Sequence, residues 1–367
     1  MEKYIGIMSG TSLDGVDTAL VETDGKSIRL LAQDFFTMPE DLKQDVLDVC
    51  IGQQTTLLKI GEIDHRLGKV FTDAVDQLID KNSLNRSDIK AIGSHGQTVF
   101  HAPDSAYPFT MQIGDANIIA AQTGITTVAD FRRKDMALGG QGAPLVPAFH
   151  KALFDHLENN IVILNIGGIA NISIINGDKT SGYDTGPGNM LMDAWVQKHF
   201  GKPYDKDAAI ARAGKVNQPL LKALLTESYL QLPAPKSTGR ELFNLPWLEE
   251  KLTRFTLSNE DVLTTLAEFT AITIANEVEE LTQNHRINEL LACGGGANNP
   301  LLMERLQQLL PEWQIGNTLK YGIDADYMEA MAFAWLAHQT INGLPGNLPA
   351  ATGASRLAVL GAIYLPS

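Results

Sequence analysis

The sequence predicts an α/β protein of two domains, and three segments carry this prediction. Residues 5–22 form an apolar run, a loop of small and polar residues and a second apolar run, which is the pattern of strand, loop and strand. Residues 161–175 repeat this pattern around a Gly-Gly turn, which indicates two related halves that each offer a loop to one ligand. In residues 290–310 a short apolar strand runs into three glycines and then a helical pattern that starts near Pro300.

Length and composition agree with a two-domain cytoplasmic protein. The chain has 367 residues, of which 44% are hydrophobic and 20% charged, enough for more than one buried core. The net charge of -14 and the absence of a dense Lys/Arg run disfavour nucleic acid or an anionic membrane as a partner. No stretch approaches the roughly 18 consecutive apolar residues of a membrane span. The N-terminus lacks the pattern of a signal peptide, and Cys50 and Cys293 are expected to be free thiols.

In the first half of the chain, strands and helices alternate after the first loop. The strand that ends at residue 92 leads into polar residues, and ligands bind at the carboxyl ends of strands in open α/β sheets. The glycine- and proline-rich residues 139–149 are interpreted as a hinge between domains, although an ordinary surface loop has the same composition. The predicted elements are a strand at 27–36, helices at 40–50 and 56–81, a strand at 89–92, a helix at 112–123 and a strand at 126–129.

The second half starts with the repeated hairpin, continues with a strand that enters GYDTGPG, and is then mainly helical. The apolar segment at 351–366 closes the chain. The predicted helices cover residues 189–200, 218–226, 246–254, 259–283, 301–310 and 326–339.

The first loop could hold a polyphosphate. Its glycines allow a sharp turn and the approach of an anion to backbone amides. Its hydroxyls can donate hydrogen bonds, and its two aspartates could hold a metal, directly or through water. An ordinary hairpin loop contains the same residue types, so this loop alone leaves both interpretations open. The residues concerned are Gly10, Thr11, Ser12, Leu13, Asp14, Gly15, Val16 and Asp17.

Four motifs resemble one enzyme family. Two phosphate-loop hairpins followed by a glycine-rich adenosine loop resemble the actin, hexokinase and Hsp70-like ATPase superfamily. Within it, the sequence is similar to the anhydro-N-acetylmuramic acid kinase family from the N-terminus to the last residues. The motifs are GTSLDGVD at 10–17, SHGQTVFH at 94–101, NIGGIANIS at 165–173 and GYDTGPGN at 182–189.

The resemblance implies a two-lobe actin-like ATPase fold of the ribonuclease H-like type, with mixed sheets flanked by helices and ATP in the interdomain cleft. The first lobe would comprise residues 1–125 plus 346–367, and the second lobe residues 126–345. The C-terminal apolar segment would pack back on the first lobe.

The activity implied by the resemblance is an ATP- and Mg²⁺-dependent kinase, a cytoplasmic homodimer of cell-wall recycling. It would hydrolytically open 1,6-anhydro-N-acetylmuramic acid and phosphorylate O6, giving N-acetylmuramic acid 6-phosphate and ADP. Two alternatives stay open at this stage. One is another sugar or acetate-type kinase of the superfamily, and the other is a nucleotide-switched binding protein.

Two acidic residues are the candidate catalytic groups. Asp184 precedes a glycine turn and a helix start, where a carboxylate serves as a metal ligand or as a base. The resemblance implies the base, and a turn or N-cap aspartate is the alternative. Glu329 is acidic on a mostly apolar helix and would hold the water or the sugar ring, unless it lies on the helix surface.

The nucleotide would be held mainly by glycine loops. No Walker A lysine follows either loop, which disfavours a P-loop fold. By resemblance, the first loop and Asn165, Gly167 and Gly168 would hold the phosphates from opposite lobes, and Asp14 or Asp17 would contact Mg²⁺ through water. The predicted adenosine-binding residues are Gly294, Gly295, Gly296 and Asn298.

The substrate carries a lactyl carboxylate that needs a cation. Arg132 is the candidate because a guanidinium can bind a carboxylate through two hydrogen bonds. The neighbouring Arg133 and Lys134 leave a solvated basic cluster as the alternative. Hydrogen bonds to the sugar hydroxyls or the acetamido group are expected from His95, Gln97 and Asp130.

Overall fold

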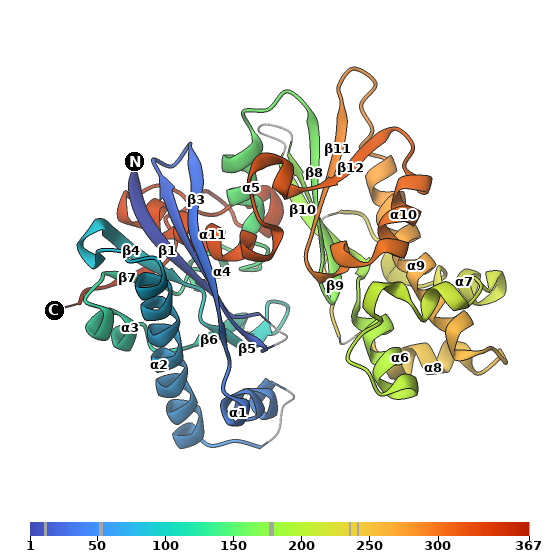
Figure 1. Ribbon diagram of the computed structural model, residues 1–367, viewed down its shortest axis with the longest axis horizontal. Coiled ribbons are helices and arrows are strands. Elements are labelled where there is room, and N and C mark those ends of the chain that lie inside the picture. The colour runs from blue at the N-terminus through green and yellow to red at the C-terminus, as the bar shows by residue number, and fades with distance from the viewer. Residues whose placement is uncertain (11–12, 51–53, 176–179, 235, 241, 367) are drawn as a thin grey trace. The chain divides into compact units, whose positions relative to one another are not determined.

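The computed structural model describes residues 1–10, 13–50, 54–175, 180–234, 236–240 and 242–366 (Figure 1). Thr11 and Ser12 of the predicted phosphate loop lie outside these residues. The chain folds into two compact units, of which the first comprises Met1–Leu153 with Tyr327–Ser367 and the second Phe154–Asp326. This division differs from the predicted lobes, because residues 126–153 and 327–345 belong to the first unit.

The first unit is built on a six-stranded mixed sheet of order β13-β7-β4-β1-β2-β3. β1, β4 and β7 run parallel, and the other neighbours pair antiparallel. Because β7 pairs with β4, the predicted boundary at residue 125 falls inside this sheet. The C-terminal segment returns to the first unit as predicted, since β13 pairs with β7. The strands are β1 Glu2–Met8, β2 Gly15–Thr23, β3 Ile28–Thr37, β4 Ile89–Ser94, β7 Thr127–Ala129 and β13 Ala362–Tyr364.

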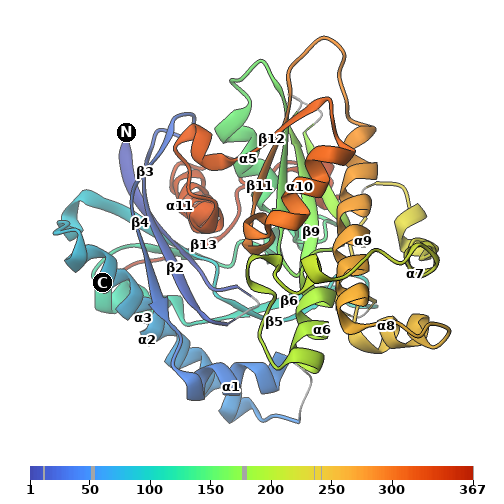
Figure 2. The ribbon, with the colours of Figure 1, turned by 45° about the vertical axis from the view of Figure 1, so that its right-hand side comes forward.

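Helices cover both faces of this sheet. α2 (Leu57–Lys81) and α3 (Ala116–Thr123) lie on one side and α11 (Met328–Ile341) on the other, as Figure 2 shows within this unit. Successive residues of a strand point to opposite faces, so Ile5 and Ile7 pack in the core with α2 while Gly6 faces α11. The remaining helices are α1 Glu40–Cys50, α4 Arg133–Ala137, α5 Val146–Phe154 and α12 Pro349–Thr352.

α11 lies directly on the backbone of the sheet. A Cβ atom added to Gly6 of β1 would lie 1.7 Å from the carbonyl oxygen of Ala330, and one added to Gly93 of β4 would lie 2.0 Å from that of Phe333. Glycine inside a strand often marks such a close approach of another backbone. The position of α11, and of any side chain on it, is therefore set by the two central strands.

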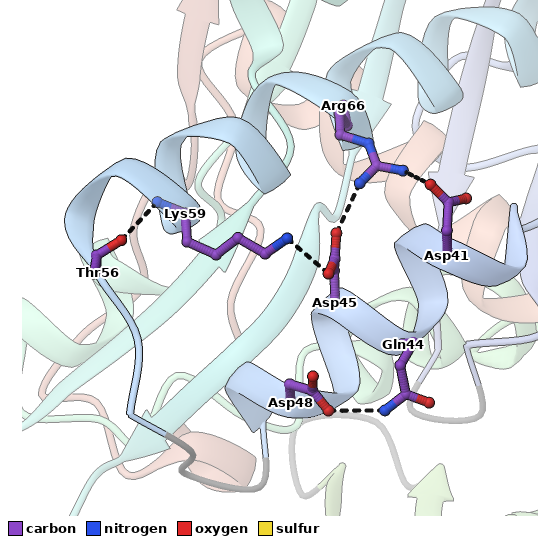
Figure 3. A network of polar contacts seen from close by, with 7 residues as sticks. All are labelled: Asp41, Gln44, Asp45, Asp48, Thr56, Lys59 and Arg66. Atoms are coloured by element: carbon purple, nitrogen blue, oxygen red, sulfur yellow. Dashed lines mark hydrogen bonds and ion pairs between the residues drawn. The ribbon is translucent and has the colours of Figure 1, made fainter.

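Polar contacts at the surface connect α1 to α2 (Figure 3). Thr56 caps α2 by accepting a hydrogen bond from the backbone N–H of Lys59 at 3.1 Å. The Lys59 ammonium lies 2.7 Å from Asp45 of α1, and Arg66 pairs with Asp45 and Asp41. Exposed ion pairs contribute little stability each, so this network mainly fixes how α1 packs against α2.

A two-stranded sheet was not foreseen from the sequence. β5 (Gln97–Ala102) pairs with β6 (Phe109–Ile113), so the predicted helix at 112–123 is wrong at its start. The helix begins at Ala116, where the side chain of Asp115 accepts a hydrogen bond from the N–H of Asn117. The burial of β6 alternates in the way expected of a strand with one solvent-facing side.

The interpretation of residues 139–149 as a hinge is wrong, because buried contacts fix this passage within the first unit. Oδ2 of the buried Asp135 accepts a hydrogen bond from the N–H of Gly142 at 2.9 Å. Its Oδ1 accepts bonds from the side chains of Thr352 at 2.8 Å and Asn347 at 2.9 Å. The boundary between the units follows later, after Leu153.

The second unit has a five-stranded sheet of order β10-β9-β8-β11-β12. From β10 to β12 the pairings are antiparallel, antiparallel, parallel and parallel, the same series that runs from β3 to β7 in the first unit. The prediction of two related halves is thus confirmed in the topology. The strands are β8 Asn160–Ile166, β9 Ile169–Ile175, β10 Ser181–Pro187, β11 Asn288–Cys293 and β12 Trp313–Asn317, the last of which was not predicted.

The core of this unit forms around α9 (Asn259–Glu279), whose buried residues contribute to two hydrophobic clusters. Its N-cap is Ser258, which accepts a hydrogen bond from the N–H of Asp261. The other helices are α6 Met190–Phe200, α7 Gln218–Leu224, α8 Leu245–Leu252 and α10 Pro300–Leu309. The short 3₁₀ helices among the described residues are η1 Arg86–Asp88, η3 Lys206–Ala208, η4 Ala211–Ala213, η5 Ser228–Gln231, η6 Gly295–Asn298, η7 Thr318–Tyr321 and η8 Ala325–Tyr327.

The predicted α/β class with mixed sheets flanked by helices is confirmed by these two units. No helix among the described residues combines the length and apolar character needed to cross a bilayer. No disulfide involves Cys50 or Cys293, and Cys293 is buried at the end of β11.

His150 on α5 should make the fold sensitive to acid. It is 3% exposed, and neither ring nitrogen has a hydrogen-bond partner among the described residues. Burial lowers its pKa to about 3, against about 6.5 in an unfolded chain. Between about pH 3 and 6.5, His150 is therefore protonated in the unfolded state but neutral in the folded state. The folded state loses stability as the pH falls from about 6.5 towards 3.

The substitution His150→Phe should remove this contribution. The free energy of unfolding of the variant minus that of the parent protein should be about 1.4 kcal/mol larger at pH 5.5 than at pH 7.5, because only the parent loses stability over this range. Urea denaturation of both proteins at the two pH values measures this difference. If the free energies of unfolding of variant and parent differ by the same amount at pH 5.5 and pH 7.5, this prediction is wrong.

Candidate active site

Three loops of the second unit meet at one edge of its sheet. β8 and β10 are both antiparallel to β9, and β11 is parallel to β8, so the carboxyl ends of β8, β10 and β11 lie on the same edge. The N–H of Asn189 donates to the carbonyl of Gly167 at 2.8 Å, and its side chain to that of Ile166 at 3.2 Å. The N–H of Gly188 donates to Gly168 at 2.9 Å. This edge is where an α/β sheet binds its ligand.

The glycines of these loops fall into two groups. At Gly294 and Gly296 the fold itself requires glycine, because an added Cβ would lie 2.4 Å from Asn165 Oδ1 and 2.3 Å from the Ile166 side chain, respectively. The other group is Gly167, Gly168 and Gly295, where the nearest protein atom would be 3.5 Å or more away and φ is not positive. At these three positions a Cβ would fit, so packing against the described residues does not require glycine.

Gly10 of the first unit resembles the second group, since an added Cβ would meet no protein atom within 4 Å. Leu13 and Val16 are buried, and Leu13 has a φ of 55°. Gly15 lies against Phe35 and the carbonyl of Phe36. Leu13, Gly15 and Val16 therefore serve packing, whereas packing against the described residues does not require glycine at position 10.

The glycine loop after β11 leads into a capped helix. Asn299 is the N-cap of α10, with its side chain accepting a hydrogen bond from the N–H of Leu302 at 3.1 Å, and Pro300 occupies the first turn. The start of the helix near Pro300 was predicted. Asn298 ends the short helix η6 immediately before this cap. The N-terminus of a helix is a favourable place for a nucleotide.

Asp184 lies inside β10, at a register shift opposite Asn171. Its Oδ2 accepts a hydrogen bond from the N–H of Thr238 at 3.0 Å, and its backbone N–H donates to the carbonyl of Lys236 at 3.0 Å. Asn189, not Asp184, is the N-cap of α6. The alternative that Asp184 caps a helix is therefore wrong, and its carboxylate is oriented by a neighbouring loop.

The loop that contains Lys236 and Thr238 was missed from the sequence. Lys236 is 8% exposed, and its ammonium lies 2.6 Å from Glu277 of α9. The hydroxyl of Tyr229 donates to the backbone carbonyl of Asp184 at 2.8 Å. No recognisable motif marks this loop, and its pairing with Asp184 spans 54 residues, so the sequence held no signal for it.

In the first unit, polar side chains gather where β1, β4 and β7 end. His95 follows β4, and its Nε2 accepts hydrogen bonds from Nε and Nη2 of Arg132 at 3.1 and 2.9 Å. Nη1 of Arg132 donates to the carbonyl of Gly142 at 2.9 Å. The hydroxyl of Ser9, just after β1, donates to Oε1 of the buried Gln97 at 2.7 Å. His95 and Arg132 are thus in direct contact, as two of the predicted substrate-binding residues.

Glu329 lies in the first turn of α11 and is partly buried. Desolvation raises its pKa, and the nearby Arg132 cation opposes this effect. Desolvation likewise lowers the pKa of Arg132, while Glu329 and Asp135 raise it. Phe333, four residues along the same face of α11, has its ring centroid 4.8 Å from that of His95. Glu329 therefore belongs to the group around Arg132 rather than to the helix surface.

The structure distinguishes Arg132 from Arg133. Nε and Nη2 of Arg133 pair with the two carboxylate oxygens of Asp130 at 2.7 and 2.6 Å, and the Arg133 side chain is 65% exposed. This pair occupies the carboxylate of Asp130, which was predicted to bind sugar hydroxyls. Asp130 has a φ of 60°, which places it in a tight turn after β7.

Sequence comparison connects this site to known enzymes. A family model described as anhydro-N-acetylmuramic acid kinase matches residues 2–366. The chain belongs to this family. The anhydro-N-acetylmuramic acid kinase of Photobacterium profundum is 61% identical and aligns over 99% of each chain. That of Vibrio cholerae serotype O1 is 62% identical over 100% of this chain and 99% of its own.

Solved structures resemble this kinase more remotely. The activator of the 2-hydroxyisocaproyl-CoA dehydratase from Clostridium difficile, with bound ADPNP, covers 91% of this chain and 94% of its own. Its sequence is 11% identical and the TM-score is 0.46. A similarity at this level says nothing about the chemistry of this kinase.

Asp14 and Asp17 were expected to contact Mg²⁺ through water. Asp14 Oδ1 lies 2.8 Å from the Lys43 ammonium, and Asp17 on β2 is opposite Met8. The described residues contain no group of three or more His, Cys, Asp or Glu side chains that could hold a metal. Mg²⁺ is commonly bound by one or two carboxylates together with the phosphates of a nucleotide. The residue types of Asp14 and Asp17 are compatible with such a site.

Proposed function

We propose that this chain is the ATP-dependent kinase that opens 1,6-anhydro-N-acetylmuramic acid by hydrolysis and phosphorylates its O6. The products are N-acetylmuramic acid 6-phosphate and ADP, which places the reaction in cell-wall recycling. The observation that carries this proposal is membership of the family over residues 2–366. A homodimer in the cytoplasm belongs to the same proposal.

In the proposed reaction, Asp184 is the base. Its carboxylate takes a proton from a water molecule whose oxygen attacks C1 of the sugar, and the C1–O6 bond breaks. O6 then attacks the γ-phosphorus of ATP, and ADP leaves. This is the chemistry of an inverting glycosidase in which the phosphoryl group, instead of a second carboxylic acid, captures the departing oxygen. The hydrogen bond from the Thr238 N–H supports this role, because it orients the carboxylate of Asp184.

The proposed nucleotide site uses backbone amides. The backbone amides of Gly10, Gly167 and Gly168 would donate to phosphate oxygens, and packing against the described residues does not require glycine at these positions. The loop of residues 294–298 would hold the adenosine. Mg²⁺ would neutralise charge on the phosphates, contacting Asp14 or Asp17 through water.

The proposed sugar site centres on Arg132. Its guanidinium would bind the lactyl carboxylate, because Arg133 is already paired with Asp130. Glu329 would contact the attacking water or the sugar ring, and Gln97 the acetamido group or a hydroxyl.

The experiment that tests the function uses purified protein, ATP, Mg²⁺ and 1,6-anhydro-N-acetylmuramic acid in ¹⁸O water, with mass spectrometry of the product. The expected product is a 6-phosphorylated sugar labelled at C1, caught before the open ring exchanges its anomeric oxygen. Phosphorylation of an ordinary sugar without ether cleavage would instead indicate a plain sugar kinase. ATP hydrolysis that depends on a polypeptide would indicate a nucleotide-switched binding protein.

A further inference from the structure

The contact between His95 and Arg132 fixes the protonation of the histidine. An arginine side chain only donates hydrogen bonds, and two of its N–H groups point at Nε2 of His95. Nε2 must therefore carry no proton, which assigns the neutral tautomer with the proton on Nδ1. His95 acts here as an uncharged acceptor.

We infer that His95 is the positioning residue for Arg132. The uncharged ring of His95 aims the guanidinium of Arg132 at a carboxylate of the substrate and leaves the charge of the guanidinium intact. This inference rests on the proposed function and assigns to His95 a role through Arg132 instead of a direct contact with the sugar.

The donors of Arg132 support this role. Its side chain has five N–H groups, of which two point at His95 and one at the carbonyl of Gly142. One N–H on each of Nη1 and Nη2 is left over, and such a pair can bind a carboxylate through two hydrogen bonds. Glu329 and Asp135 act on the charge of Arg132, but no hydrogen bond among the described residues occupies these two N–H groups. They are therefore available to a ligand.

The acceptors around Arg132 are held rigidly. His95 is 6% exposed and its ring packs on Phe333. Gly142, which has a φ of 71°, donates its N–H to Asp135 while its carbonyl accepts from Arg132. Ring packing thus holds His95 and a buried hydrogen bond holds Gly142, so both acceptors fix the guanidinium before any ligand binds.

The electrostatics of His95 agree with an uncharged ring. Desolvation, followed by the nearby Arg132 cation, lowers the pKa of His95 well below its usual value of 6.5. A protonated ring would bring a second cation to Arg132 and lose the acceptor. A carboxylate in place of His95 would orient Arg132 equally well, but it would compete with the substrate for the charge.

The test compares His95→Phe with His95→Gln. Phenylalanine keeps the ring packing and removes the acceptor, whereas the glutamine side chain can place an oxygen near the position of Nε2. For His95→Phe, KM for 1,6-anhydro-N-acetylmuramic acid should rise about 10- to 100-fold, as expected for the loss of a buried partner of a charged group. The kcat and the KM for ATP should change less than about threefold, and His95→Gln should keep KM within about fivefold of the parent value.

A double-mutant cycle separates positioning from direct contact with the sugar. In an Arg132→Ala background, His95→Phe should have little further effect on KM, because the group it positions is gone. A full additional loss in that background would show that His95 acts on the substrate by itself and would overturn the inference. An unchanged KM for His95→Phe alone would also overturn it.

Two controls complete the design. His338 on α11 is also buried and packs on Tyr4 at 5.3 Å, away from Arg132, so His338→Phe should leave KM unchanged. If His95→Phe does not fold, His95→Asn replaces it, because its shorter side chain cannot reach Arg132, and its KM should then exceed that of His95→Gln by about tenfold. Absence of turnover in the parent protein would contradict the proposed function, whereas turnover with equal KM values in these variants would contradict only the positioning role.

Discussion

Replacing Asp184 by asparagine should lower kcat for 1,6-anhydro-N-acetylmuramic acid by about 10²- to 10⁴-fold, the usual contribution of a general base. Asparagine has nearly the same shape and can still accept the hydrogen bond from Thr238, so the fold and the binding of ATP should persist. Steady-state kinetics gives kcat, and titration with an ATP analogue gives the nucleotide affinity.

The matched control is Asp205→Asn. Asp205 belongs to the same unit, and its carboxylate also accepts hydrogen bonds from backbone amides, those of Ile210 at 2.9 Å and Ala211 at 2.8 Å. It has no part in the proposed reaction, so kcat should stay within about threefold of the parent value. A kcat of the Asp184 variant within about tenfold of the parent would rule out Asp184 as the base.

The substitution Gly6→Ala should prevent the first unit from folding stably. The added methyl would lie 1.7 Å from the carbonyl oxygen of Ala330, and both atoms belong to elements that cannot move independently. Overpacking a core usually costs about 1–3 kcal/mol. A clash with a backbone atom should exceed about 4 kcal/mol. Guanidinium denaturation, or the yield of soluble protein, measures the loss.

Gly61→Ala also adds one methyl group, but it is expected to raise the stability of the protein instead of lowering it. Gly61 is exposed within α2, and an added Cβ would meet no protein atom within 4 Å. Alanine there should stabilise the protein by about 0.5–1 kcal/mol, because glycine is a poor helix former. A parent-like denaturation midpoint for Gly6→Ala would show that α11 can move away from β1.

Local patterns predicted much of this fold. The apolar periodicity of residues 56–81 matches α2, and Asn299 with Pro300 marks the start of α10, because caps and periodicity depend on neighbours in the sequence. The repeated strand, glycine loop and strand correctly indicated two halves of like topology. The strand that ends near residue 92 correctly indicated the carboxyl edge of the first sheet as the place where polar side chains gather.

What the sequence could not reveal depends on distant partners. The short strands β5, β6 and β12 owe their structure to pairing rather than to length or pattern. Residues 139–149 are held by a backbone hydrogen bond from Gln141 to Thr352 near the C-terminus. The pairing of Asp14 with Lys43 spans 29 residues, and that of His95 with Arg132 spans 37. Glycines within strands, such as Gly93, are the one feature of the sequence that indicates the close approach of another backbone, here that of α11.

The order in which the chain is synthesised gives the discontinuous first unit a further consequence. Its opening segment ends at Leu153, and its remaining part starts only at Tyr327, whereas the second unit is one continuous stretch. On the ribosome, the sheet face that bears Gly6 and Gly93 therefore stays uncovered until α11 has emerged. The second unit can complete its sheet earlier, so the half that is begun first is the half that is finished last.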